Sequence, residues 1–114
     1  MRLRETERKN KPLTEPVLLI LLSLAEKPRH GYALAKDIEA LSLGRVRLST
    51  GTLYGALARL LEDGWIERFE QADASREKQA YRLAAAGRKA MLAEIGRMKQ
   101  MTRAAAARLR VREV

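Results

Sequence analysis

Residue types that could perform catalysis are scarce in this chain of 114 residues, which has no cysteine and one histidine. The absence of cysteine excludes disulfides, thiolate metal ligands and a cysteine nucleophile, and His30 alone cannot form a histidine cluster. Asp37, Glu62 and Asp63 fall at helical positions typical of solvated charges rather than of catalytic pairs. We therefore predict a protein that is not an enzyme and that needs no metal and no cofactor.

The charge of the chain indicates an acidic partner. Lysine and arginine number 23 against 14 acidic residues, a formal net charge of +9. Nucleic acid, an anionic membrane surface or an acidic protein would be attracted by this excess. Aromatic residues make up only 4% of the chain, which disfavours the base stacking that RNA readers commonly use. The longest apolar run, Val17–Leu22, is too short to span a membrane, so we expect a cytoplasmic protein without a membrane partner.

Three hydroxyl side chains gather where a helix is predicted to begin. Ser49 is a good N-cap by residue type, and Thr50 and Thr52 follow it. The first N–H groups of a helix have no partner within the helix, so hydroxyls beside them provide a favourable environment for a phosphate or a base edge. This start is a candidate site for contact with DNA.

The same helix, predicted over residues 50–63, has a face of small residues. With Leu53 at the centre of the buried face, Gly51 and Gly55 lie roughly opposite, and Tyr54 and Arg59 lie on the two shoulders, within reach of flanking phosphates. Small residues let a helix backbone approach DNA closely, although the same pattern also suits packing against another helix. A glycine such as Gly55 inside a helix costs about 0.5–1 kcal/mol relative to alanine, so a compensating contact is expected.

The remaining elements place this helix in a winged helix-turn-helix. Hydrophobic periodicity predicts helices at about residues 14–27, 32–41 and 85–110, and β-propensity predicts strands at 65–70 and 80–83. Pro28–Gly31 is predicted as a turn, and Leu34, Ile38 and Leu41 as one buried stripe. The predicted fold class is mainly α with a small β-hairpin, and the second and third helices form the helix-turn-helix.

The predicted hairpin is basic. Arg76 and Lys78 lie in its loop, and Arg68 and Arg82 lie on its strands. Basic wings often meet the phosphate backbone or the minor groove, so Arg76 and Lys78 are candidate DNA contacts. The alternative is a solvated loop, because acidic residues in the same loop weaken its positive field.

The last predicted helix carries an apolar stripe that a small domain could not cover. The stripe repeats every seven residues and consists of Met91, Ile95, Met98, Thr102, Ala105 and Leu109. Such a seam usually pairs with another helix, so we predict a homodimer. The predicted organisation is a basic arm at residues 1–12, a DNA-binding unit at 13–84 and a dimerisation helix at 85–114.

Several ordered motifs resemble those of the PadR family of bacterial transcriptional regulators. They are His30-Gly31-Tyr32, Ser49-Thr-Gly-Thr-Leu-Tyr54, Asp63-Gly64-Trp-Ile66 and Tyr81-Arg-Leu83, and the resemblance covers about residues 13–95. A single long final helix is similar to the smaller subgroup of that family. One departure is Gly55, where the family usually has proline.

The resemblance implies a homodimeric, cytoplasmic repressor of transcription that binds a palindromic operator in double-stranded DNA. The helix at 50–63 would enter the major groove, and Ser49, Gly51, Thr52 and Tyr54 fall on the family's recognition motif. A small-molecule effector is a further possible partner. Two other classes remain open: a winged-helix adaptor that binds an acidic protein without specific DNA binding, and a basic RNA-binding domain.

Overall fold

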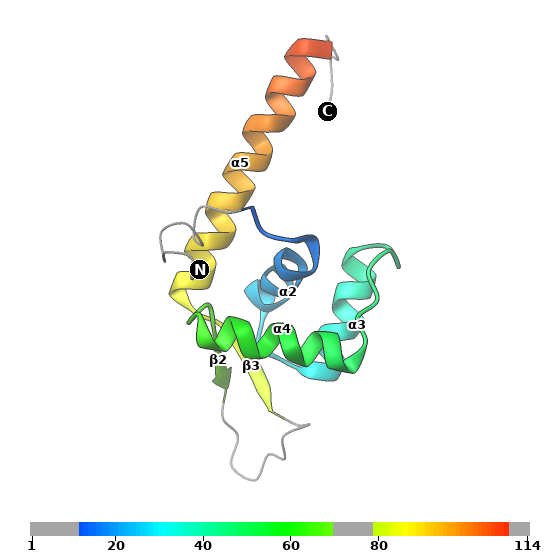
Figure 1. Cartoon of the computed structure of the whole chain (residues 1–114), viewed down its shortest axis with the longest axis vertical. Helices are drawn as coiled ribbons and strands as arrows, with labels where there is room; N and C mark the ends of the chain where they lie inside the picture. The colour runs from blue at the N-terminus through cyan, green and yellow to red at the C-terminus, as the bar shows by residue number, and fades with distance from the viewer. Residues whose placement is uncertain (1–11, 70–78, 110–114) are drawn as a thin grey trace, which may run out of the picture.

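The computed structural model of the protein describes residues 12–69 and 79–109. The elements follow the chain as α2 (Glu15–Glu26), β1 (Arg29–His30), α3 (Gly31–Leu41), α4 (Thr50–Glu62), β2 (Ile66–Phe69), β3 (Ala80–Leu83) and α5 (Ala85–Leu109). Figure 1 shows α3, α4 and the sheet around α2, with α5 projecting away from them. The predicted fold class, a winged helix-turn-helix with a long C-terminal helix, is confirmed.

Helix α2 forms the centre of the core because it is apolar on nearly every side. It begins at Thr14, whose hydroxyl accepts a hydrogen bond from the N–H of Val17. Pro16 lies in the first turn, where a missing N–H costs nothing. Helices α3 and α5 and strand β3 all pack against α2. The buried residues of α2 are Leu19, Ile20, Leu21, Ser23 and Leu24.

The sheet has one strand more than the sequence predicted. The predicted hairpin strands are confirmed as β2 and β3, but residues 29–30, predicted as a turn, form β1. Strand β1 pairs antiparallel with β3, so that the strand order is β1-β3-β2. His30 has extended dihedrals (φ −75°, ψ 160°) because it is the N-cap residue of α3, and this lets it and Arg29 pair with β3. Two residues are too few to show a hydrophobic period.

Local capping residues set the ends of α4. The hydroxyl of Ser49 accepts a hydrogen bond from the N–H of Thr52 at 3.2 Å, as its predicted N-cap role requires. Gly64 adopts a positive φ of 76° after the helix, where a residue with a Cβ would be strained. Leu34 and Ile38 are buried as predicted, but Leu41 is 48% exposed. The prediction was wrong for Leu41, which is the last residue of α3, because no further turn of the helix follows to continue the buried stripe.

The first turns of α5 lie against the winged helix through a close backbone contact. A Cβ at Gly87 would lie 2.1 Å from the carbonyl oxygen of Trp65, so only glycine fits. Met91 is 4% exposed and belongs to the core of its own chain. This corrects the assignment of Met91 to the dimerisation stripe: the exposed stripe starts further along the helix, after Ile95, which is half-buried.

Candidate nucleic-acid interface

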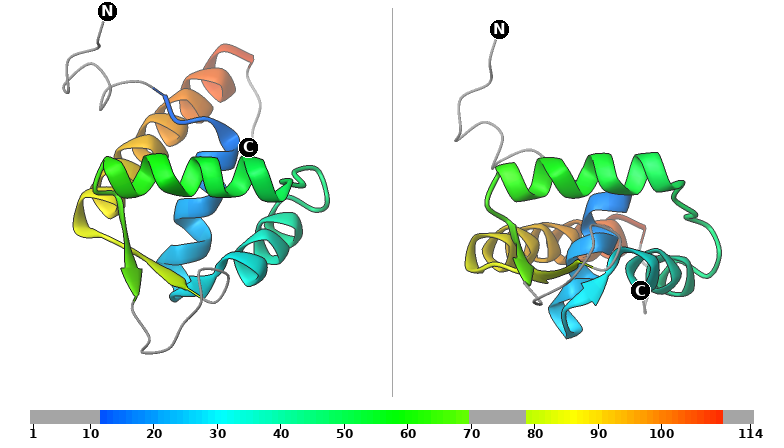
Figure 2. Two further views of the ribbon diagram at one scale, coloured as in Figure 1. Left: turned by 60° about the horizontal axis from the view of Figure 1, so that its bottom comes forward. Right: turned by 90° about the horizontal axis from the view of Figure 1, so that it is seen from below.

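Helix α4 is the outer layer of the winged helix. Figure 2 shows it lying across the molecule, with α2, α3 and the sheet all on one side of it. Leu53, Leu57 and Leu60 are buried against that side. The opposite face is exposed along the helix and carries Gly51, Gly55, Ala58 and Glu62.

The small residues of this face do not serve packing within the described chain. A Cβ built at Gly51 or Gly55 meets no atom of another part of the described residues within 4 Å. Packing of this face against another element is therefore excluded within residues 12–69 and 79–109. What remains is a strip of α4 that another molecule can approach to backbone distance, as the major groove of DNA, about 12 Å wide, would require.

The start of α4 carries one hydroxyl that is already hydrogen-bonded within the helix, that of Ser49, and two exposed threonines. Ser49 caps the helix and its hydroxyl also donates to Oγ1 of Thr52 at 3.0 Å, so its own hydrogen-bonding capacity is largely used. Thr50 and Thr52 are exposed beside it. The positive end of the helix dipole lies at the same place and favours a phosphate.

Tyr54 lies partly inside the protein rather than free on the surface. Its ring covers Gly31 at the start of α3, where an added Cβ would fall 2.3 Å from the tyrosine hydroxyl oxygen. The glycine at position 31 is thus required by Tyr54, a contact that the sequence did not indicate. Tyr54 also lines the groove between α4 and the sheet.

The charges around α4 differ in whether they are paired. Arg45 lies within ion-pair distance of Glu15, and Arg47 of Glu39, at 3.3 Å. Within the part of the chain that the structure describes, no carboxylate lies at ion-pair distance from Arg59, which is exposed on a shoulder of α4. The predicted contacts Arg76 and Lys78 lie outside the described residues.

Comparison with known proteins identifies the family to which this interface belongs. The model of the transcriptional regulator PadR-like family matches residues 20–93, which contain α3, α4, both hairpin strands and the start of α5. The chain belongs to the PadR-like family. Members of this family are DNA-binding regulators of transcription, not enzymes.

Solved structures share the fold of this PadR-like regulator at low sequence identity. A transcriptional regulator from Clostridium thermocellum superposes with a TM-score of 0.68 and 21% identity, over 91% of this chain and 97% of that one. A PadR family transcription regulator from hypervirulent Clostridium difficile also superposes with a TM-score of 0.68 and 21% identity, over 84% of this chain and 99% of that one. These likenesses show that the fold is shared over most of the chain.

A curated relative matches a shorter segment. An uncharacterized 37.1 kDa protein in transposon Tn4556 of Streptomyces fradiae is 56% identical over 43 residues, or 38% of this chain. The matched segment amounts to 12% of that protein's length.

Neither a metal-binding cluster nor a membrane-spanning helix occurs among the described residues. They contain no group of three or more histidine, cysteine or acidic side chains placed to hold a metal. Nor does any helix among them combine the length and apolarity needed to cross a membrane.

The exposed part of α5 carries most of the predicted apolar stripe, and no other described element covers it. Met98 is 44% exposed and Leu109 72%, and Ala105 is exposed between them. The one polar member, Thr102, donates its hydroxyl to the backbone carbonyl of Met98 at 2.8 Å. Its hydrogen bond is thereby satisfied within the helix, so the stripe can contact an apolar surface at little cost.

A polar cluster that was not predicted from the sequence holds α2, β1 and α3 together. Asp37, predicted to be a solvated charge, accepts a 2.6 Å hydrogen bond from Ser23 and lies 3.4 Å from the guanidinium of Arg29. Ser23 is 1% exposed within the apolar helix α2. A buried hydroxyl requires a partner, so Ser23 was the signal in the sequence.

Proposed function

We propose that this PadR-like regulator is a homodimeric repressor that binds a palindromic operator in double-stranded DNA by its sequence. The observation that carries the proposal is the open face of α4, where Gly51 and Gly55 have empty space around them. No contact among the described residues offsets the cost of these glycines, but close approach to base edges would. Contacts from Thr50, Thr52 and Arg59 would orient the helix in the groove.

The dimer is supported by the stripe on α5. Residues Ile95 to Leu109 extend for about 20 Å at 1.5 Å per residue, and this length carries the exposed apolar side chains. A second copy related by a two-fold axis would cover the same stripe on both helices. The two copies of α4 would then face successive major grooves, about 34 Å apart, and their DNA site would be palindromic.

Regulation by a small molecule fits the same interface. Met98 and Met101 provide flexible, polarizable apolar surface near the proposed two-fold axis. A small molecule bound there would change the angle between the two α4 helices and hence their fit to successive grooves. We place the protein in the cytoplasm, where the DNA of a bacterium lies.

The experiment that tests the proposal measures binding to DNA from immediately upstream of the protein's own reading frame. Scrambled DNA of equal length is the control, both are measured at two salt concentrations, and the oligomeric state is determined in parallel. Specific sites typically bind about 10³- to 10⁷-fold more tightly than random DNA. A preference for the upstream DNA by a dimer is the expected result.

Equal and steeply salt-dependent binding to both fragments would contradict the proposal for that fragment, because it would reflect net charge alone. A genome-wide selection of bound fragments then decides the matter. If it yields no preferred sequence, the repressor proposal fails, and the adaptor that binds an acidic protein becomes the better description.

A further inference from the structure

A groove separates α4 from the strands of the wing, β2 and β3. Its volume is about 350 Å³ and it opens beside Ala58 on the exposed face of α4. Its walls combine apolar side chains with the polar side chains of Arg68 and Gln79, and Tyr54 and Tyr81 also line it. The remaining lining residues are Leu57 and Leu61.

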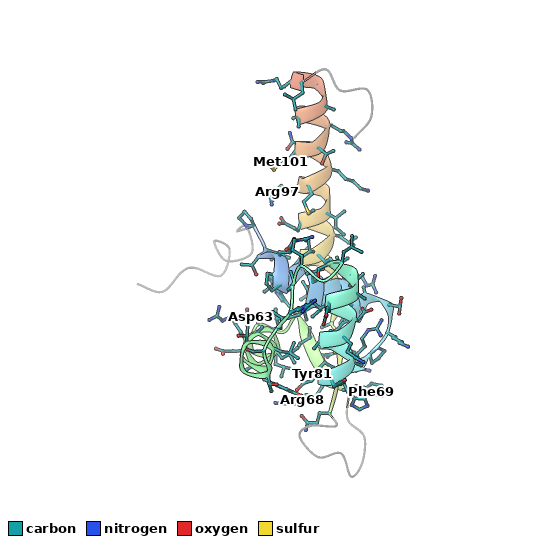
Figure 3. All side chains as sticks on the ribbon, turned by 90° about the vertical axis from the view of Figure 1, so that its right-hand side faces the viewer. Asp63, Arg68, Phe69, Tyr81, Arg97 and Met101 are labelled. Carbon is teal, nitrogen blue, oxygen red and sulfur yellow. The ribbon has the colours of Figure 1, made fainter. Side chains whose placement is uncertain are left out.

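Strand alternation aims Arg68 into this groove. Arg68 pairs in register with Tyr81, whose buried ring marks the side of the sheet that faces the core and α4. Figure 3 shows Arg68 and Tyr81 on the α4 side of the sheet and Phe69 on the other side. Arg82 belongs to that other side, where it pairs with Glu67 at 3.2 Å and lies 5.8 Å from the centre of the Phe69 ring.

Arg68 keeps its charge free of any partner in the described chain. Its side chain is exposed, and among residues 12–69 and 79–109 no carboxylate lies at ion-pair distance from it. The neighbouring carboxylate of Glu67 is taken by Arg82. A free guanidinium beside a groove that contains no acidic side chain favours an anion there.

One shoulder of α4 carries a positive charge and the other does not, and Arg68 supplies a positive charge beside the uncharged one. At about 100° per residue, Arg59 lies on one shoulder, and the other carries Tyr54 and Leu61, neither of them charged. A helix in the major groove lies between two walls of phosphates, one from each DNA strand. Arg59 faces one wall, and the sheet supplies Arg68 toward the other.

We propose that a backbone phosphate of DNA enters the groove between α4 and the wing and is bound by Arg68. This inference rests on the proposed function, since it assumes that α4 enters the major groove. The side-chain amide of Gln79, which also lines the groove, provides an additional donor. Arg59 and Arg68 thereby hold α4 between two phosphate walls. The contact adds affinity without reading sequence.

The test replaces Arg68 by glutamine and measures affinity against salt on the upstream fragment and on its scrambled control. The logarithm of the DNA association constant falls linearly with the logarithm of the salt concentration. Each lost phosphate contact makes this slope about 0.9 less steep, and at about 0.1 M salt it weakens binding roughly eightfold. A dimer loses one contact in each protomer. We expect Arg68→Gln to weaken binding to both DNAs by the same factor and to make the salt dependence of both less steep.

Matched variants separate a groove contact from general charge. Arg82→Gln removes the same charge from the opposite side of the sheet and is expected to change the slope far less. Arg68→Lys keeps a cation and should keep the slope. Gln79→Glu places a negative charge inside the groove and should weaken binding to both DNAs. Circular dichroism checks that each variant is folded.

The outcomes distinguish this inference from the proposed function. If wild-type protein prefers the upstream DNA but Arg68→Gln keeps its slope, the phosphate groove is wrong and the repressor proposal stands. If Arg82→Gln lowers the slope as much as Arg68→Gln, the groove is also wrong. If wild-type protein shows no preference, the repressor proposal loses support, while a lower slope for Arg68→Gln alone on both DNAs still establishes the groove.

Discussion

Replacing Gly55 by alanine should stabilise the protein and weaken its binding to DNA. The fold has open space for the added methyl group, because no atom of another part of the described residues lies within 4 Å of a Cβ at this position. Alanine removes the entropic cost of glycine in a helix, about 0.5–1 kcal/mol. The corresponding rise in melting temperature is about 2–6 °C for a domain of this size.

The same substitution should lower the affinity of the protein for DNA. The methyl group lies on the face that would approach base edges, so it moves the backbone of α4 away from them. A good bidentate base contact contributes about 1–3 kcal/mol, so losing one lowers affinity roughly five- to 150-fold. Gly55→Ala should fall near the lower end of that range, and Gly55→Leu, with a longer side chain on the same face, near the upper end.

The assay combines thermal unfolding with titration of the preferred DNA fragment. Gly96→Ala is the matched control, because Gly96 also lies inside a helix with open space around it but is on α5. It should stabilise the protein similarly and leave DNA affinity unchanged. The reasoning is refuted if Gly55→Leu binds the fragment as tightly as wild-type protein does, since the open face would then not meet DNA.

Three further predictions concern α5. Gly87→Ala should destabilise the fold by about 1–3 kcal/mol in urea unfolding, because the new Cβ would lie 2.1 Å from a carbonyl oxygen; unchanged stability would show that the contact relaxes freely. The hydrogen bonds from Arg97 hold the pKa of Glu94 below its ordinary value of 4.5, so this pair contributes stability above that pH and loses it as the pH falls through the lowered pKa. The difference in urea midpoint between wild-type protein and Glu94→Gln should therefore shrink between about pH 7 and pH 3, and a constant difference would contradict the charge assignment. Met98→Lys should weaken the proposed dimer at least about tenfold in sedimentation equilibrium, whereas Ala104→Lys, on the opposite side of α5, should not; equal effects would place the interface elsewhere.

Residues that act through their immediate neighbours in the chain determined much of the fold. The helices follow from apolar residues at helical spacing, and their ends follow from Thr14, Ser49 and Gly64. The face of α4 that lies opposite Leu53 could also be derived in this way, because the geometry of one helix relates its residues by a fixed angle.

Only the tertiary structure decided which residues distant in the chain meet. Strand β1 exists because β3 lies beside it, Tyr54 requires a glycine at position 31, and Asp37 binds Ser23 across 14 residues. Met91 continues the periodic stripe of α5 in the sequence, but in the structure it is covered by its own chain. The period of a helix shows which side chains share a face, but the packing of other elements decides what covers that face.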